Sequence, residues 1–117
     1  PMTVLLILNR RPYDGTDVTW NALRLAQALR LQGTGVRIFL MNDAVDLARP
    51  GARPEGAEFD LGKMLLDLGQ AGAEVKLCTT CITRCGLSRE ALATPEWAAR
   101  MTDLARWVTE SDRVLTF

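Results

Sequence analysis

The sequence contains no histidine. This absence excludes serine–histidine and cysteine–histidine nucleophile pairs, acid–base catalysis by an imidazole and every metal site with a histidine ligand. The reactivity of any cysteine in the chain must therefore be set by nearby charges, hydrogen bonds, helix ends or a partner protein.

Neither sign of charge is in excess. The chain carries 14 basic and 14 acidic residues, so its formal net charge is zero. Because phosphate binding needs a basic surplus or a basic stripe, nucleic acid is not an expected partner. The content of 48% hydrophobic and 24% charged residues is typical of a soluble globular protein. With 117 residues, the chain is expected to form one domain that spans residues 1–117.

Long apolar runs are also missing. A membrane helix needs about 20 consecutive apolar residues. The opening run at residues 2–9 is too short, and it lacks the charged start and the cleavage site of a signal peptide. We therefore expect no membrane partner and a cytoplasmic location. In that compartment a cysteine cluster is more often catalytic, redox-active or metal-binding than a structural disulfide framework.

Strand and helix patterns alternate along the chain. Short apolar runs predict four strands, at residues 4–8, 36–41, 74–77 and 113–117. Helical spacing of apolar residues predicts three main helices, over residues 18–32, 61–68 and 94–110. This alternation predicts an α/β fold in which helices cover a mostly parallel central sheet.

The apolar faces of the first and last helices can be predicted residue by residue. In the first helix the inward positions are Val18, Ala22, Leu25, Ala26 and Leu29. In the last helix, which is predicted to begin at Thr94-Pro95-Glu96, they are Trp97, Met101, Leu104, Ala105 and Val108. Three large side chains lie off these faces and are expected to be exposed at a subunit interface: Trp20, Leu31 and Trp107.

The three cysteines form one cluster after the third predicted strand. Cys78, Cys81 and Cys85 have the spacing C-x2-C-x3-C in a predicted loop over residues 78–86. Sites in open α/β sheets form beyond the carboxyl ends of the strands, so the thiols lie where function is expected. A C-x2-C pair can be redox-active, and basic or hydroxyl groups can stabilise a thiolate. Side chains of both kinds flank the thiols: Lys76, Thr79, Thr80, Thr83, Arg84 and Arg89.

The residues alone leave three interpretations of the thiols open. The cluster can carry sulfur, act as a thiol–disulfide redox sensor, or hold a metal ion or iron–sulfur centre in an oligomeric binding subunit. Zinc and iron–sulfur sites usually have four protein ligands, and the chain has neither a fourth cysteine nor a histidine. A metal centre would need carboxylates, an exogenous ligand or another subunit, so no resident metal or cofactor is expected.

Several segments together resemble one known family. They are Pro12-Tyr13-Asp14 after the first strand, Asn21-Ala22-Leu23-Arg24-Leu25-Ala26, residues 33–42, and Gly72-Ala73-Glu74-Val75-Lys76-Leu77-Cys78-Thr79-Thr80-Cys81 followed by Gly86. Over nearly the whole chain this pattern resembles the DsrE/DsrF-like family, which includes YchN-type proteins and TusD-type sulfur-relay subunits. The resemblance implies a flavodoxin-like three-layer α/β sandwich that assembles into homotrimers or hexamers.

The resemblance also implies roles for the thiols. Cys78 matches a carrier cysteine that accepts sulfane sulfur as a persulfide from a donor protein and passes it to an acceptor protein, a sulfurtransferase-like activity. Cys81 matches a second cysteine of the YchN-type subgroup. Cys85 stands before Gly86, where the family commonly has an arginine, and Arg84 is displaced by one position; the added thiol could resolve a persulfide as a disulfide. The expected binding residues are Tyr13, Asp14, Thr79, Thr80 and Arg84.

Overall fold

Five parallel strands form the centre of the molecule, which the computed structural model describes over residues 1–117. The strands are β1 (Thr3–Leu8), β2 (Gly35–Leu40), β3 (Glu74–Cys78), β4 (Ala98–Ala99) and β5 (Arg113–Thr116). Their order across the sheet is β4-β3-β2-β1-β5, and every pairing is parallel. The predicted parallel α/β sheet is confirmed.

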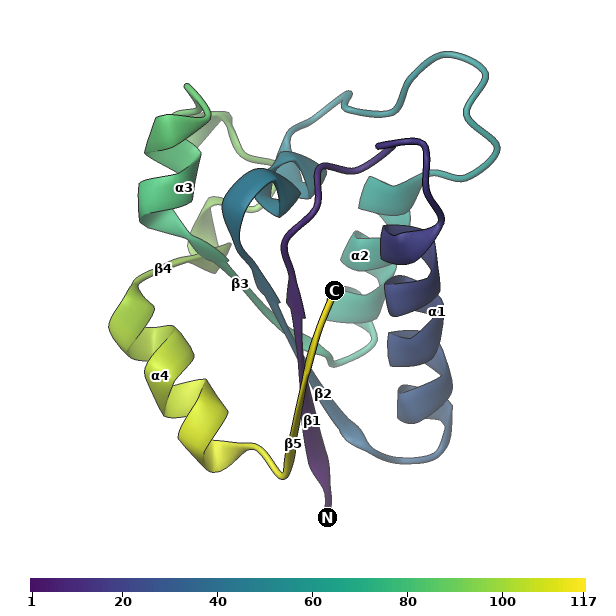
Figure 1. Ribbon diagram of the computed structural model, residues 1–117, viewed down its shortest axis with the longest axis vertical. Helices are drawn as coiled ribbons and strands as arrows, with labels where there is room; N and C mark the ends of the chain where they lie inside the picture. Colours follow the sequence, from purple (N-terminus) through teal and green to yellow (C-terminus); the bar gives the residue numbers. More distant parts are fainter.

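Helices cover both faces of this sheet. The α-helices are α1 (Val18–Leu31), α2 (Leu61–Gln70), α3 (Thr79–Arg84) and α4 (Met101–Glu110), and the 3-10 helices are η1 (Asn42–Ala48), η2 (Arg89–Ala91) and η3 (Pro95–Trp97). Figure 1 shows α1 and α2 on one face and α4 on the other, which confirms the expected three layers. The strand order differs from the 2-1-3-4-5 order of flavodoxin itself, because the chain adds β2, β3 and β4 on one side of β1 and then β5 on the other.

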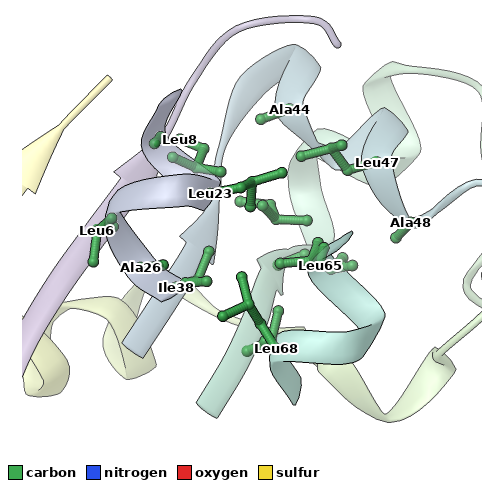
Figure 2. Close-up of a cluster of buried hydrophobic side chains, with 14 of the residues drawn as sticks. Leu6, Leu8, Leu23, Ala26, Ile38, Ala44, Leu47, Ala48, Leu65 and Leu68 are labelled. Carbon is green, nitrogen blue, oxygen red and sulfur yellow. The ribbon is translucent and has the colours of Figure 1, made fainter. Parts of the chain in front are cut away.

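The larger hydrophobic layer lies between the sheet and helices α1 and α2. It contains 21 buried residues, many of which are drawn in Figure 2. Alternate side chains of a strand point to the same face, so Leu6 and Leu8 of β1 meet Leu23 of α1 and Leu65 of α2 there. This packing fixes the sheet against the two helices.

The smaller layer lies under α4. Its six buried residues are Leu5, Phe39, Cys78, Ala99, Leu104 and Trp107. Trp107 is only 2% exposed, and its ring packs edge-on against Phe39 with the centroids 6.1 Å apart. The prediction that Trp107 is exposed was therefore wrong, because the indole fills the space between α4 and the centre of the sheet. Cys78 belongs to this layer, on the side of the sheet that α4 covers.

The predicted last helix is interrupted. Residues 95–97 form η3, residues 98 and 99 form β4, and α4 begins only at Met101. The break arises from tertiary pairing, because Ala98 and Ala99 align with the last two residues of β3. The inward face of α4 is Leu104 and Trp107, whereas three positions predicted to face inward are exposed: Met101, Ala105 and Val108.

Helix α1 is also rotated relative to the prediction. Its buried residues are Thr19, Ala22, Leu23 and Ala26, whereas Leu25, which was predicted to face inward, is 37% exposed. Leu31 is 90% exposed, as predicted. Trp20 is half-buried, because its ring stacks on Phe59 with the centroids 4.5 Å apart.

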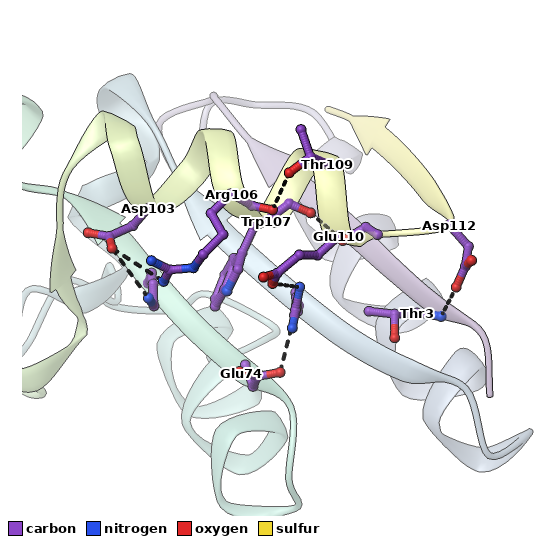
Figure 3. Close-up of polar contacts among 11 residues, drawn as sticks. Thr3, Glu74, Asp103, Arg106, Trp107, Thr109, Glu110 and Asp112 are labelled. Atoms are coloured by element: carbon purple, nitrogen blue, oxygen red, sulfur yellow. Dashed lines mark hydrogen bonds and ion pairs between the residues drawn. The ribbon is translucent and has the colours of Figure 1, made fainter.

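Charged contacts hold α4 on the sheet (Figure 3). Arg37 of β2 pairs with Glu74 at 3.2 Å and with Glu110 of α4 at 3.0 Å. The cationic groups of Arg37 and Lys76 lie 5.4 and 4.9 Å from the centre of the Trp107 ring. Trp107 is therefore held by cations as well as by apolar contacts.

Candidate functional site

Strand β3 leads into α3 without an intervening loop, so the predicted loop over residues 78–86 was wrong. Cys78 ends β3 and also serves as the N-cap of α3. Its sulfur accepts a hydrogen bond from the backbone N–H of Cys81, with Sγ and N 3.3 Å apart. A sulfur in this position replaces the oxygen that usually caps a helix.

Cys81 receives its hydrogen bond from the neighbouring strand end. The backbone N–H of Asn42, just after β2, donates to the Cys81 sulfur at 3.2 Å. Asn42 has a left-handed backbone, with φ of 51°, and its side-chain amide donates to the Asn9 side chain at 3.0 Å. Burial of the Cys81 thiol, followed by its hydrogen bond with Cys78, raises the pKa of Cys81, and the Asn42 N–H opposes this shift. Cys81 is therefore held largely as a neutral thiol at neutral pH.

Cys85 is the exposed member of the cluster. Its sulfur lies 4.0 Å from a carboxylate oxygen of Asp43. Partial desolvation of the sulfur, followed by the negative charges of Asp43 and Asp46, raises the pKa of Cys85. A surface thiol with a raised pKa is accessible but is only weakly ionised at neutral pH.

Two hollows in the surface adjoin the thiols. The inner hollow, of about 660 Å³, is lined by Cys78, Cys81, Thr80, Arg84, Arg100 and neighbouring residues. The outer hollow, of about 250 Å³, is lined by Asn42, Asp43, Cys81, Arg84 and Cys85. Asn42, Cys81 and Arg84 line both hollows. The arrangement places one thiol in each hollow and one thiol between them.

The walls of the inner hollow come from the carboxyl ends of β2, β3 and β4. Thr79, Thr80 and Arg84 lie there, in agreement with their expected place beside the thiols. The Thr79 hydroxyl donates to the Ala99 carbonyl at 2.6 Å, so it joins α3 to β4 rather than pointing freely at a sulfur. Arg84 and Arg100 form no ion pair. They leave positive charge available to an anionic group in the hollow.

Tyr13 and Asp14 lie apart from the thiols and line neither hollow. The Tyr13 hydroxyl donates to the Phe59 carbonyl at 2.9 Å and accepts from the Leu61 N–H at 3.0 Å. Asp14 accepts hydrogen bonds from the N–H and the hydroxyl of Thr16. Both residues therefore organise the loop before α1 and the start of α2, and their expected role in binding stays a prediction.

Removal of the Tyr13 hydroxyl tests this structural role. In Tyr13→Phe the Phe59 carbonyl and the Leu61 N–H lose their shared partner, so the free energy of unfolding is expected to fall by about 1 kcal/mol. Denaturant unfolding measures the change. Persulfide or alkylation chemistry at the cysteines should stay as in the wild type, and an altered thiol reactivity would contradict the separation of the two regions.

Sequence reasoning missed the parts of the site that come from distant segments. Four residues from distant segments line the inner hollow: Met41, Ala99, Arg100 and Met101. The last three lie where β4 ends and α4 begins, and the prediction of one continuous helix over residues 94–110 did not include this junction. Asn42 directly follows the predicted strand over residues 36–41, and this position was the only signal in the sequence that it lies near the site. Nothing in the sequence indicated that its backbone N–H contacts Cys81.

The metal interpretation finds no support within one chain. No group of three or more cysteine, aspartate or glutamate side chains is arranged to hold a metal ion. The Cys78 and Cys81 sulfurs accept backbone hydrogen bonds, and Cys85 opens to the other hollow. A metal centre would therefore need an exogenous ligand or ligands from a second subunit.

The carboxylate of Asp43 should affect how the alkylation rate of Cys85 depends on pH. In Asp43→Asn the negative charge near the sulfur is removed, so the pKa of Cys85 is expected to fall toward its ordinary value. Alkylation of Cys85 at pH 7.5 should become severalfold faster, because the thiolate is the reacting form. Iodoacetamide labelling followed by peptide mass spectrometry across pH 6–10 measures this, and an unshifted pH profile would contradict the assignment.

Comparison with known proteins identifies the family of this chain. The model of the DsrE/DsrF-like family matches residues 2–117. Protein YchN of Escherichia coli is 37% identical over 116 residues, which cover 97% of each chain. An uncharacterized protein of Methanopyrus kandleri is 36% identical over 114 residues, which cover 97% of this chain and 93% of the relative.

Solved structures give the same assignment. The crystal structure of YchN from E. coli has a TM-score of 0.87 and 36% identity, with 100% of both chains covered. A conserved protein of unknown function from Bacteroides thetaiotaomicron has a TM-score of 0.71 at 16% identity, covering 97% of this chain and 94% of its own, and so shares the fold alone. Because the family model and relatives above one-third identity span nearly the whole sequence, this chain belongs to the DsrE/DsrF-like family.

Proposed function

We propose that this protein is a sulfur carrier in which Cys78 accepts sulfane sulfur as a persulfide and passes it to a partner protein. The observation that carries the proposal is the position of the Cys78 sulfur, which accepts the Cys81 N–H at the start of α3 and lines an open hollow beside two arginines without ion pairs. Membership of the DsrE/DsrF-like family agrees with a sulfur-related role.

The reaction needs no group that the site lacks. The Cys78 thiolate attacks the outer sulfur of a donor persulfide or polysulfide, a new S–S bond forms, and the donor leaves as a thiolate that takes up a proton. In the second step an acceptor thiolate attacks the outer sulfur of the Cys78 persulfide, the S–S bond to Cys78 breaks, and Cys78 leaves as a thiolate. Arg84 and Arg100 would stabilise an anionic donor in the inner hollow. The activity is sulfurtransferase-like and requires no resident cofactor.

The partners in this proposal are a sulfur donor protein, an acceptor protein and further copies of the chain, in the cytoplasm. None of the helices is long and apolar enough to cross a bilayer. Assembly into a trimer or hexamer is supported by apolar side chains left in solvent: Leu31, Met101, Val108, Val114 and Leu115 are each at least 37% exposed. All four residues of the edge strand β5 are exposed. Light scattering after size exclusion tests the oligomeric state.

A redox sensor is the second candidate, because Cys78 and Cys81 already interact. The side chain of Cys78 contacts Cys81 closely enough to raise the pKa of the Cys81 thiol through a hydrogen bond. A C-x2-C pair at a helix start is suited to reversible disulfide formation. In this function the chain gains and loses electrons rather than sulfur.

Intact-protein mass spectrometry separates the candidates. The reduced wild-type protein is incubated with inorganic polysulfide and freed of excess reagent before measurement. Addition of one sulfur, about 32 Da, supports the carrier function, whereas a loss of about 2 Da without an adduct supports the redox sensor. An unchanged mass in both polysulfide and mild oxidant would exclude both functions for the isolated chain.

A further inference from the structure

The solvent exposure of the three thiols increases from Cys78 to Cys85 along one side of α3. They are spaced i, i+3 and i+7, which places them on the same helical face. The backbone N–H of Cys85 donates to the Cys81 carbonyl at 3.0 Å, so the helical path continues to the third cysteine. Cys78 is buried, Cys81 is half-buried and Cys85 is exposed. Cys81 is the one thiol that lines both hollows.

Access to the thiols differs with the size of the sulfur donor. Cys78 is 6% exposed and lines only the inner hollow, whose volume of about 660 Å³ admits a small molecule. A persulfide carried by a donor protein can reach only a thiol that is exposed where the surfaces of the two proteins meet. Of the three thiols, only Cys85 is presented for such a contact. Small polysulfides and protein persulfides should therefore meet different thiols first.

The spacing of Cys81 and Cys85 on the helix is too wide for an unstrained disulfide but suits the transfer of a sulfur atom between them. Residues four apart on a helix have Cβ atoms about 5–6 Å apart, whereas a disulfide needs about 3.5–4.5 Å. A persulfide extends its side chain by one S–S bond of about 2 Å, so its outer sulfur can span the remaining gap. The pair Cys81 and Cys85 is therefore better suited to passing a sulfur atom than to closing a disulfide within the intact helix.

We propose that Cys85 is the receiving thiol for protein donors, and that sulfur moves from Cys85 through Cys81 to Cys78 and returns by the same thiols to a protein acceptor. This inference rests on the proposed carrier function. In each step the inner thiolate attacks the outer sulfur of the neighbouring persulfide. One S–S bond forms and one breaks, and the outer cysteine leaves as a thiolate that takes the proton released by the attacking thiol. No oxidant or reductant is consumed.

The test compares two donors on the same set of variants. The protein donor is a rhodanese-type sulfurtransferase loaded with thiosulfate and desalted, and the small donor is inorganic polysulfide. Samples are quenched with an alkylating agent and digested with trypsin. Cleavage after Lys76, Arg84 and Arg89 separates the peptide of residues 77–84 from that of residues 85–89, and fragmentation distinguishes Cys78 from Cys81.

With the protein donor, the wild type should show sulfur on Cys85 before Cys78. Cys85→Ser should lose loading of Cys78, and Cys81→Ser should keep sulfur on Cys85 without passing it on. With polysulfide, Cys78 should be loaded in both variants. The control Thr83→Ala alters an exposed residue of α3 that lines neither hollow, and it should behave as the wild type with both donors.

Two results would overturn the relay while leaving the carrier function intact. The first is Cys78 loading in Cys85→Ser by the protein donor at the wild-type rate. The second is a wild type that takes sulfur from polysulfide but none from the protein donor. If polysulfide loads no cysteine in the wild type, the carrier function itself fails. Circular dichroism of each variant confirms that a lost transfer is not lost folding.

Discussion

Cys78→Ser is expected to lose polysulfide-dependent sulfur loading in the peptide of residues 77–84. A serine hydroxyl can still accept the Cys81 N–H that Cys78 accepts at 3.3 Å, so the helix start is preserved. The hydroxyl remains protonated at neutral pH and does not attack sulfane sulfur, because the reacting form of this position is a thiolate. Site-resolved mass spectrometry after polysulfide treatment measures the loss.

The matched variant is Cys85→Ser, which removes a thiol from the outer hollow alone. Its loading at residues 77–84 by polysulfide should equal that of the wild type, because the small donor enters the inner hollow directly. If instead Cys78→Ser retains the adduct at Cys81 and passes it to an acceptor at the wild-type rate, Cys78 is not the carrier. The carrier role would then move to Cys81.

Trp107→Ala should lower the free energy of unfolding by about 3–5 kcal/mol. Trp107 is 2% exposed and supplies the largest side chain of the layer under α4. Its removal opens a cavity against Phe39, whose ring packs edge-on against the indole, and it withdraws the aromatic face from Arg37 and Lys76. Denaturant unfolding followed by circular dichroism gives the difference.

Val108→Ala provides the comparison on the same helix. Val108 is 40% exposed, so its truncation should change the free energy of unfolding by no more than about 0.5 kcal/mol. Trp107→Phe keeps an aromatic ring in the layer and should recover part of the stability. Equal losses in Trp107→Ala and Val108→Ala would show that the outward-facing prediction for Trp107 from the sequence was right after all.

The sheet and the thiol positions could be predicted because their signals are local. Branched and apolar runs mark β1, β2 and β3 without reference to the rest of the chain. Cys78 ends β3, and the other two cysteines follow it closely. Asp60 is a capping residue type that directly precedes α2 in the sequence, and its carboxylate accepts the Lys63 N–H at 3.0 Å. In each case a short stretch of sequence contains all the groups that determine the structure.

The second face of the sheet could not be predicted because its signals are not local. Alanine has the highest helix propensity of the amino acids, and Ala98 and Ala99 form a strand only because β3 offers unpaired backbone groups. Two apolar stripes compete on α4, and the one with Leu104 and Trp107 is buried because it meets Phe39 on the sheet. Residues of β4 and α4 also form part of the wall of the inner hollow. For this reason Arg100 was not predicted to be a site residue.

The unequal layers on the two faces affect how long a bound sulfur stays sheltered. The layer under α1 and α2 contains 21 buried residues and the layer under α4 contains six. Segments with few buried contacts detach from a protein at lower free energy than the rest, so α4 opens more readily than α1 or α2. Cys78 belongs to the smaller layer. Under the proposed carrier function, a small reductant would reach a persulfide on Cys78 through the inner hollow, and transient opening of α4 would give larger reductants a second route to the same sulfur.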